Sequence, residues 1–219
     1  MWVDLSVPWQ ACLDEAWAAC MAGSMPIGAV VVSSSGQILS RGRNRIRDTE
    51  EVPGEICGHH FAHAEMNCLF KVAKLDKAEA HQASLYTTLQ PCPMCFGTFY
   101  AAGLRELHYA SRDAYGGGDD ALGKTPYLSR KPIKVFPPDD PELEQMVIAL
   151  YTADALANPS PGFDAVLEEE KKILPLAFSF GEFLHKEKWI TRMRETRSTP
   201  RAVYDNLVYL FMNVFPSSR

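Results

Sequence analysis

Two short motifs in this 219-residue chain supply side chains that can bind a metal ion and move a proton. The first is His-Ala-Glu at 63–65, and the second is Pro-Cys-Pro-Met-Cys at 91–95. Three protein ligands leave one position of a tetrahedral zinc ion open, which is typical of a catalytic site. We therefore predict that His63, Cys92 and Cys95 bind Zn²⁺ and that Glu65 is a separate general acid and base.

The spacing of these residues fits that chemistry. Cys92 and Cys95 are three residues apart, so their side chains point the same way at the start of a helix. A helix N-terminus favours anions, which helps to keep both sulfurs as thiolates. His63 lies on a separate, earlier helix, and two helices packed side by side on a sheet can bring all three ligands to one metal. Glu65 leaves its helix in a different direction and can approach the open position without occupying it.

A structural zinc site is the alternative for the same residues. Such a site would need a fourth Cys or His ligand at short spacing. Cys57, His59, His60 and Cys68 lie near enough in the sequence to keep this alternative open.

His-x-Glu followed by Pro-Cys-x-x-Cys resembles the signature of the zinc-dependent nucleobase deaminases. The chain is similar to the cytidine-deaminase-like superfamily, and within it to the branch with tRNA adenosine deaminases and guanine deaminases, over roughly its first two-thirds. The resemblance implies that zinc lowers the pKa of a bound water and that Glu65 shuttles protons. An exocyclic ring amine is then replaced by a carbonyl, and ammonia is released.

Helices alternate with strands in the first part of the chain, which favours an α/β fold. The resemblance implies a three-layer α-β-α cytidine-deaminase-like fold with a mixed five-stranded sheet and both metal motifs at helix N-termini. A long connection over 113–132 favours parallel fourth and fifth strands. The predicted helices are 8–23, 63–74 and one that begins at 91, and the predicted strands are 27–32, 37–44, 84–89, 107–111 and 133–136.

From residue 141 onward the pattern is helical, with further helices predicted over 163–173, 176–193 and 201–214. The resemblance does not extend to this tail. We therefore predict a zinc-dependent deaminase core over residues 1–138 and a helical C-terminal extension, without an assigned role, over 139–219.

Composition excludes several classes of protein. The chain is 47% hydrophobic and 22% charged, as in ordinary globular domains. No apolar run approaches the roughly 20 residues of a membrane span, and no secretory signal is visible, so we expect a cytoplasmic protein with unbridged cysteines. The net charge of −5 argues mildly against extensive contact with nucleic acid phosphates.

The resemblance also implies substrate contacts. Asn44, at the end of the second predicted strand, takes this role, and Ala64 and Pro91 are further candidates. His60 could line the pocket or be a loop residue, and Phe61 could border the base pocket or only pack against the sheet. Gln90 stands where many relatives have Glu, which puts in doubt any contact that needs a carboxylate there.

Four arginines at alternate positions, here called the arginine stripe, flank Asn44: Arg41, Arg43, Arg45 and Arg47. Alternate strand positions share a face, so the stripe could bind a phosphate or an RNA backbone. Its other interpretation is a solvated strand edge protected by charge.

We expect a hydrolytic deaminase that acts on a small nucleobase, nucleoside or nucleotide. A tRNA adenosine deaminase is the first alternative, favoured by Ser-Arg-Asp-Ala at 111–114 and by the arginine stripe. Deoxycytidylate deaminase and a non-catalytic, zinc-stabilised binding module are further alternatives. Analogy with relatives predicts a homodimer.

Overall fold

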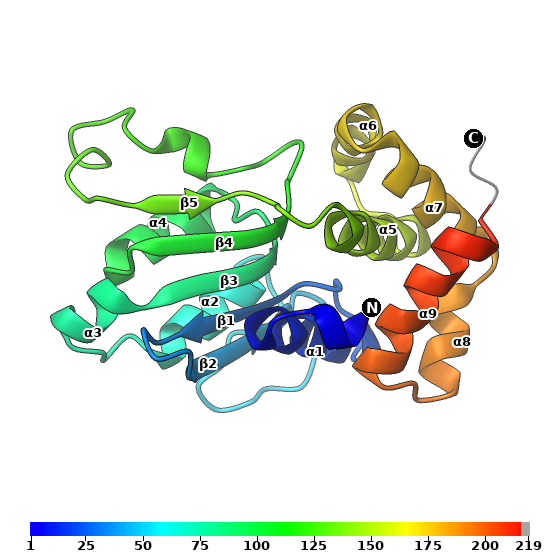
Figure 1. Ribbon diagram of the computed structural model, residues 1–219, viewed down its shortest axis with the longest axis horizontal. Coiled ribbons are helices and arrows are strands. Elements are labelled where there is room, and N and C mark those ends of the chain that lie inside the picture. Colours follow the sequence, from blue (N-terminus) through cyan, green and yellow to red (C-terminus); the bar gives the residue numbers. More distant parts are fainter. Residues whose placement is uncertain (216–219) are drawn as a thin grey trace.

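A computed structural model describes residues 1–215 of the chain. Its elements follow one another as shown in Figure 1: η1 (Trp2–Asp4), α1 (Val7–Met21), β1 (Gly28–Val32), β2 (Ile38–Arg43), α2 (Ala64–Lys71), α3 (Lys77–Gln82), β3 (Ser84–Leu89), α4 (Pro93–Ala102), β4 (Glu106–Ser111), η2 (Asp119–Ala121), β5 (Lys134–Phe136), α5 (Pro141–Ala157), α6 (Phe163–Ile173), α7 (Pro175–Lys186), α8 (Trp189–Glu195) and α9 (Pro200–Asn213).

The strands form one mixed sheet in the order β2-β1-β3-β4-β5. Strand β1 pairs antiparallel with both β2 and β3, whereas β3, β4 and β5 run parallel to one another. The prediction of a mixed five-stranded sheet with parallel fourth and fifth strands is therefore confirmed. The connection between β4 and β5 contains the short helix η2.

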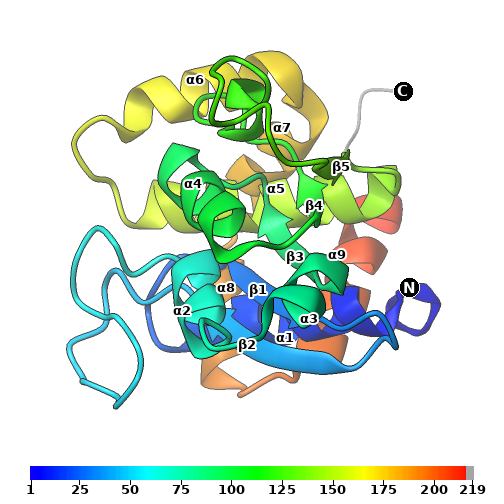
Figure 2. The same ribbon diagram turned by 90° about the vertical axis from the view of Figure 1, so that its left-hand side faces the viewer.

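Helices cover both faces of the sheet and make three layers (Figure 1 and Figure 2). Strand β1 is buried along its whole length because both of its faces are covered. Val30 and Val32 pack with residues of α1 on one face. Ala29 and Val31 belong to a cluster on the other face, together with residues of α2 and α4. The helices that carry the two metal motifs thus lie on the same side of the sheet.

A glycine lets β2 approach α2 closely. A Cβ atom at Gly42 would lie 2.4 Å from the carbonyl oxygen of Ala64 and 2.4 Å from the backbone nitrogen of Cys68. Any other residue at this position would push the first turn of α2 away from the sheet. Gly42 therefore helps to set the position of the His-Ala-Glu motif.

The helices of the C-terminal part, α5 to α9, gather at one end of the sheet, on the right of Figure 1. This confirms the predicted helical C-terminal part. Trp17 of α1 and Ala110 of β4 share an apolar cluster with Leu143, Phe180 and Trp189 of the C-terminal helices. Hydrophobic burial therefore holds these helices against the deaminase-like part. The boundary between residues 138 and 139 stays a prediction.

Three local details differ from the sequence-based expectations. The helix predicted over 176–193 is two helices, because Lys188 has a left-handed backbone (φ 51°) that ends α7 and begins α8. Helix α3 was not predicted; it is capped by Asp76, whose side chain accepts a hydrogen bond from the Glu79 N–H. Helix α4 begins at Pro93 rather than at residue 91, which leaves Cys92 as its N-cap.

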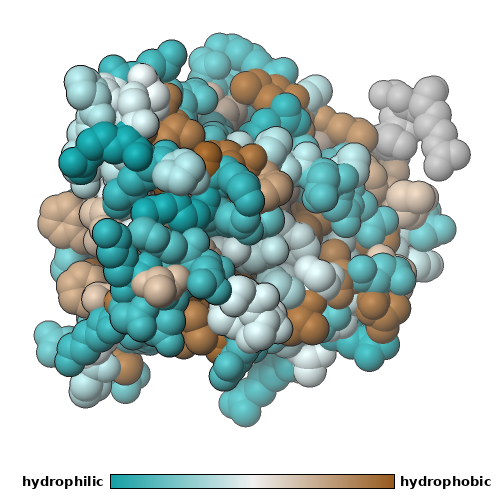
Figure 3. All heavy atoms as spheres, turned by 60° about the vertical axis from the view of Figure 1, so that its left-hand side comes forward, coloured by the Kyte–Doolittle hydropathy of each residue, from teal (hydrophilic) through white to brown (hydrophobic). Residues whose placement is uncertain are grey.

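Apolar side chains on the face shown in Figure 3 form separate patches between hydrophilic ones. Within residues 1–215, no helix has the length and apolar character needed to cross a bilayer.

Candidate active site

The two metal motifs lie at the N-termini of two neighbouring helices. His63 is the N-cap of α2 and Cys92 is the N-cap of α4, and both have extended backbones. Each N-cap carbonyl accepts the first intrahelical hydrogen bond, from Asn67 and Phe96 respectively. The positive ends of both helix dipoles therefore point at the same place, where they favour thiolates.

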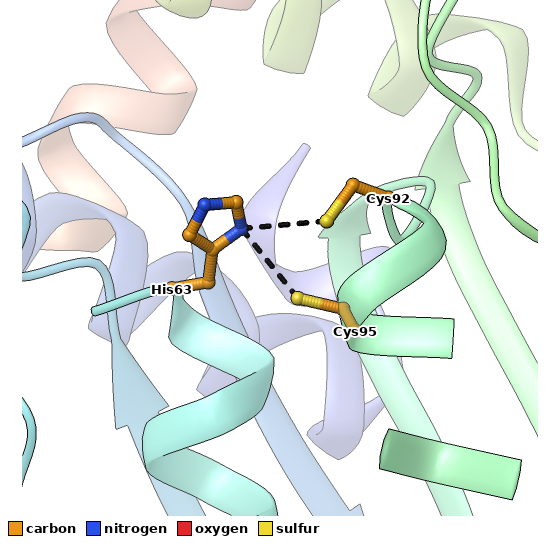
Figure 4. Close-up of side chains that lie close together, drawn as sticks. All are labelled: His63, Cys92 and Cys95. Carbon is orange, nitrogen blue, oxygen red and sulfur yellow. Dashed lines mark hydrogen bonds between the residues drawn. The ribbon is translucent and has the colours of Figure 1, made fainter. Parts of the chain in front are cut away.

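His63, Cys92 and Cys95 converge in space, as Figure 4 shows. Nδ1 of His63 lies 3.8 Å from Sγ of Cys92 and 3.5 Å from Sγ of Cys95. Tetrahedral zinc with ordinary bond lengths would place its nitrogen and sulfur ligands about 3.5–3.8 Å apart. The three side chains thus fit a zinc ion. Among the described residues, they are the one group of three His, Cys, Asp or Glu side chains close enough to hold a metal.

The protonation of the two thiols agrees with this fit. A hydrogen bond from the Cys95 thiol lowers the pKa of Cys92 to about 4, assisted by His63. The same hydrogen bond, with burial, raises the pKa of Cys95 well above its usual range. A divalent cation bound between the two sulfurs would favour the thiolate form of both cysteines.

Glu65 lies beside the three ligands. Its side chain is 3% exposed, and burial raises the pKa of its carboxyl group. Oε1 accepts a hydrogen bond of 3.2 Å from the Thr87 hydroxyl, and Oε2 accepts one of 3.5 Å from the Cys95 thiol. A buried carboxyl group with a raised pKa, held next to a metal site, has the properties of a general acid and base.

A cavity of about 310 Å³ opens over this cluster. Residues from the ends of all the neighbouring elements line it: Met25, Ile27, Asn44, Ile46, His60, His63, Glu65, Leu89, Gln90, Cys92, Asp113, Tyr115, Tyr151, Phe163 and Val166. The last three come from α5 and α6. Sequence reasoning missed them, because the tail carries no motif and its apolar residues are indistinguishable from core residues.

Asn44 lies where the resemblance placed it. It is 1% exposed and lines the cavity. Its Oδ1 accepts hydrogen bonds from the Ser24 hydroxyl (2.7 Å) and from the Ile46 N–H (3.1 Å). The amide NH₂ group is thereby left for a ligand. Ser24 precedes the first strand and was not singled out from the sequence.

Of the other four residues predicted to contact the substrate, only His60 is among the described residues that line the cavity. Ala64 is fully buried in the first turn of α2, and Pro91 is buried just before Cys92. Phe61 is 60% exposed and packs edge-on against His59. Substrate contact by these four residues stays a prediction.

Gln90 connects the cavity to the segment after β4. Its Oε1 accepts a hydrogen bond of 3.0 Å from the Asp113 N–H, and its Nε2 donates one of 2.6 Å to Asp119. A Cβ atom at Gly118 would lie 2.7 Å from the Cys92 backbone. The glycine run at 116–118 therefore permits close approach to the metal motif, and Gln90 holds the loop in place.

The arginine stripe is engaged in ion pairs. Asp48 pairs with both Arg43 and Arg45. The Arg47 pair joins the segment after β2 to α5. These contacts neutralise the charge that an RNA backbone would need. The pairs are Arg41–Asp14, Arg41–Glu15, Arg43–Asp48, Arg45–Asp48, Arg45–Glu55 and Arg47–Asp154.

Comparison with known proteins agrees with this geometry. Residues 6–111 match the model of the cytidine and deoxycytidylate deaminase zinc-binding region. The chain is 36% identical over 111 residues to the tRNA-specific adenosine deaminase of Bacillus subtilis (strain 168). This alignment covers 50% of this chain and 63% of that protein. The chain is 28% identical over 140 residues to the guanine deaminase of the same organism, which covers 62% of this chain and 76% of that one.

A solved structure is also similar. The guanine deaminase of Nitrosomonas europaea matches with a TM-score of 0.50 and 28% identity, over 68% of this chain and 83% of that one. The chain thus spans less than two-thirds of the adenosine deaminase and larger shares of the two guanine deaminases. The match to the family model ends at residue 111, before the C-terminal helices α5 to α9 begin.

Proposed function

We propose that this protein is a zinc-dependent hydrolytic deaminase of a small nucleobase, nucleoside or nucleotide. Residues 6–111 match the family model of the cytidine and deoxycytidylate deaminase zinc-binding region, which supports this class of reaction. The observation that carries the proposal is the convergence of His63, Cys92 and Cys95 beside the buried Glu65, at the floor of a cavity. Three ligands and a separate carboxylate are what this hydrolysis needs.

The residues divide the chemistry between them. A zinc ion held by the three ligands would supply an activated water molecule. Glu65 accepts one proton of the attacking water and delivers it to the ring nitrogen. It then transfers the second proton to the exocyclic amine, which leaves as ammonia while the water oxygen becomes the carbonyl. Thr87 orients the carboxylate through Oε1, and Asn44 offers its NH₂ group to an acceptor on the ring.

The dimensions and charge of the site support a small substrate. The cavity of about 310 Å³ lies at the lower end of the range of small-molecule sites, about 300–1,000 Å³. Helices α5 and α6 line one side of it. The arginine stripe is occupied by carboxylates and does not offer free cations to an RNA backbone.

A tRNA adenosine deaminase is the second candidate, favoured by the 36% identity to the Bacillus subtilis enzyme. A non-catalytic zinc-stabilised module is the third. Homodimer formation and a cytoplasmic location remain predictions of the sequence.

One assay separates these candidates. Purified zinc-loaded protein is incubated with adenine, guanine, cytosine, their nucleosides and unmodified tRNA, and ammonia and inosine are measured. We expect ammonia from at least one base or nucleoside. Inosine formed only in tRNA would refute the small-molecule proposal in favour of the second candidate.

Glu65→Ala is the matched variant. The turnover rate of this variant should fall at least about a thousandfold, but it should keep one zinc per chain because Glu65 is not a ligand. Turnover that survives in Glu65→Ala would refute the proton-transfer role. A wild-type protein that releases no ammonia from any substrate would leave the binding module as the better interpretation.

A further inference from the structure

Helix α6 presents three residues on one face to the cavity and its border. Phe163, Val166 and Glu170 are spaced by three and four positions, so their side chains share one side of the helix. Phe163 and Val166 line the cavity. Glu170 is 1% exposed, and its Oε1 accepts a hydrogen bond of 3.2 Å from the Ala114 N–H. Helix α6 therefore forms one wall of the cavity through Phe163 and Val166, and through Glu170 it holds the backbone of a neighbouring segment in place.

The segment that Glu170 supports also borders the cavity. Asp113 and Tyr115, on either side of Ala114, both line it. Asp113 Oδ1 accepts hydrogen bonds from the N–H groups of Tyr115 and Gly116, which fixes a tight turn. Arg112, which precedes Asp113, is also tied to the C-terminal part, because it forms an ion pair with Glu144 of α5.

The wall itself is apolar and aromatic. Phe163 packs against Tyr151 of α5, with ring centroids 6.3 Å apart and an angle of 31° between the planes. Val166 extends the same surface, and both side chains pack against the apolar cluster that contains Tyr151. A flat heteroaromatic ring would bury its face on such a surface.

The charge of the cavity lining also affects which substrates can bind. Its lining includes the carboxyl groups of Glu65 and Asp113, and none of the described lining residues is Lys or Arg. A phosphate group would therefore enter next to the carboxyl groups of Glu65 and Asp113, and the described lining offers it no lysine or arginine to pair with. The lining disfavours nucleotides and accepts uncharged bases and nucleosides.

We propose that α6 is the specificity element of this site: Phe163 and Val166 form the surface on which an uncharged base packs, and Glu170 positions the 112–116 segment that closes the same cavity against nucleotides. This inference rests on the proposed function and narrows its substrate class. Phe163 and Val166 act by contact, whereas Glu170 acts as a positioning residue through the Ala114 backbone.

Equilibrium binding tests the inference separately from catalysis. Zinc-loaded Glu65→Ala protein is titrated by calorimetry with adenine, guanine, cytosine, their nucleosides and their 5′-monophosphates. We expect the best base or nucleoside to bind at least about tenfold more tightly than its monophosphate. A monophosphate that binds as tightly as its nucleoside, or more tightly, would overturn the charge argument.

Variants of α6 test the wall. Phe163→Ala and Val166→Ala, each in the Glu65→Ala background, should weaken binding of the tightest-binding base or nucleoside about tenfold. Ile173→Ala is the matched control, because Ile173 lies on the same helix, is 47% exposed and is not among the lining residues. Equal affinity of Phe163→Ala, Val166→Ala and the control would refute the role of the wall.

Glu170→Ala tests the positioning role in otherwise wild-type protein. We expect KM for the best substrate to rise about fivefold or more with a smaller change in kcat, and Glu170→Gln to restore KM because its amide oxygen can still accept from Ala114. Glu168→Ala on the exposed side of α6 is the control. If Gln does not restore KM, the hydrogen bond is not responsible and the positioning role fails. Absence of ammonia release would refute the proposed function, whereas the calorimetric results decide the inference.

Discussion

The Ser24 hydroxyl donates a hydrogen bond of 2.7 Å to Oδ1 of Asn44, and the Ile46 N–H donates a second, of 3.1 Å, to the same oxygen. A backbone N–H can only donate, so the amide oxygen must face these two groups. The NH₂ group of Asn44 is consequently left for the cavity. A ligand that binds here must present an acceptor to Asn44, and two residues outside the metal motifs decide this polarity.

Ser24→Ala should therefore raise KM for the preferred substrate about threefold to tenfold, because the Asn44 amide keeps only one of its two fixed donors. The free energy of unfolding should fall by about 1–2 kcal/mol, because the Ser24 hydroxyl donates to Asn44 and also accepts from the Arg47 N–H at 3.3 Å. Steady-state kinetics and urea denaturation measure the two effects.

Ser40→Ala is the control for this variant. Ser40 is also buried, and its hydroxyl donates to the Cys68 carbonyl at 3.0 Å, but it does not line the cavity. It should lose similar stability with KM unchanged. A KM that rises equally in both variants would mean that the effect is a general loss of stability.

Thr87→Val should lower kcat about tenfold, because Oε1 of Glu65 loses the hydroxyl that orients it. Thr87→Ser keeps the hydroxyl and should retain most of the activity. Thr88→Val is the control, since the Thr88 hydroxyl accepts from the Gly28 N–H and does not contact Glu65. If Thr88→Val slows turnover as much as Thr87→Val does, the orienting role is wrong.

Removal of zinc should destabilise the fold as well as abolish turnover, because the ligands come from two helices that only the folded chain brings together. Cys92→Ala should bind less than one zinc per chain and melt about 5 °C or more below the zinc-loaded wild type. Cys57→Ala should keep its zinc and its melting temperature, since Cys57 lies outside the ligand cluster. Metal analysis and calorimetry decide this, and zinc loss from Cys57→Ala would revive the structural alternative.

Stability should depend on pH through Glu170. Burial, with repulsion from Asp113 and Glu144, raises the pKa of its carboxyl group to about 7 from an ordinary value of 4.5. Between these values the folded state binds more protons than the unfolded state, so this group lowers the free energy of unfolding as pH rises through that window. Above about pH 7 the contribution is constant.

Glu170→Gln cannot ionise and should lose this dependence. Relative to wild type it should gain on the order of 2–3 kcal/mol between about pH 4.5 and about pH 8. Glu168→Gln, at an exposed position, should follow the wild-type curve. Parallel curves for wild type and Glu170→Gln, from urea denaturation across this range, would contradict a raised pKa.

The proposed chemistry of this protein could be predicted from the sequence because its signals are local. Cys92 and Cys95 are fixed by helical spacing, and helix N-termini are recognisable from the prolines and the motif order. The α/β fold class followed from alternating helices and strands, and the resemblance to the deaminase superfamily implied the mixed five-stranded sheet. The resemblance assigned a substrate contact to Asn44, and the structure places this residue in the cavity lining with 1% exposure. The contact itself stays a prediction.

The partners of charged residues could not be predicted in this way. Two interpretations of the arginine stripe, a phosphate-binding face and a solvated strand edge, were open. Its carboxylate partners come from α1, a loop and the distant α5: Asp14, Glu15, Asp48, Glu55 and Asp154. Only the fold shows that the stripe is used within the chain. The same holds for Gln90, whose exchange for the usual Glu became interpretable once its contacts with Asp113 and Asp119 were known.

The sequence alone indicated the candidate metal ligands, the carboxylate proposed to transfer protons and the α/β core, since each depends on residues close in the chain or on regular periodicity. The tertiary structure decided what surrounds them. Phe163, Val166 and Glu170 carry no motif, and they reach the cavity because α5 and α6 pack at the end of the sheet. Hydrophobic packing is not directional, so the side of the molecule that an apolar helix covers depends on the whole fold and cannot be read from its own residues.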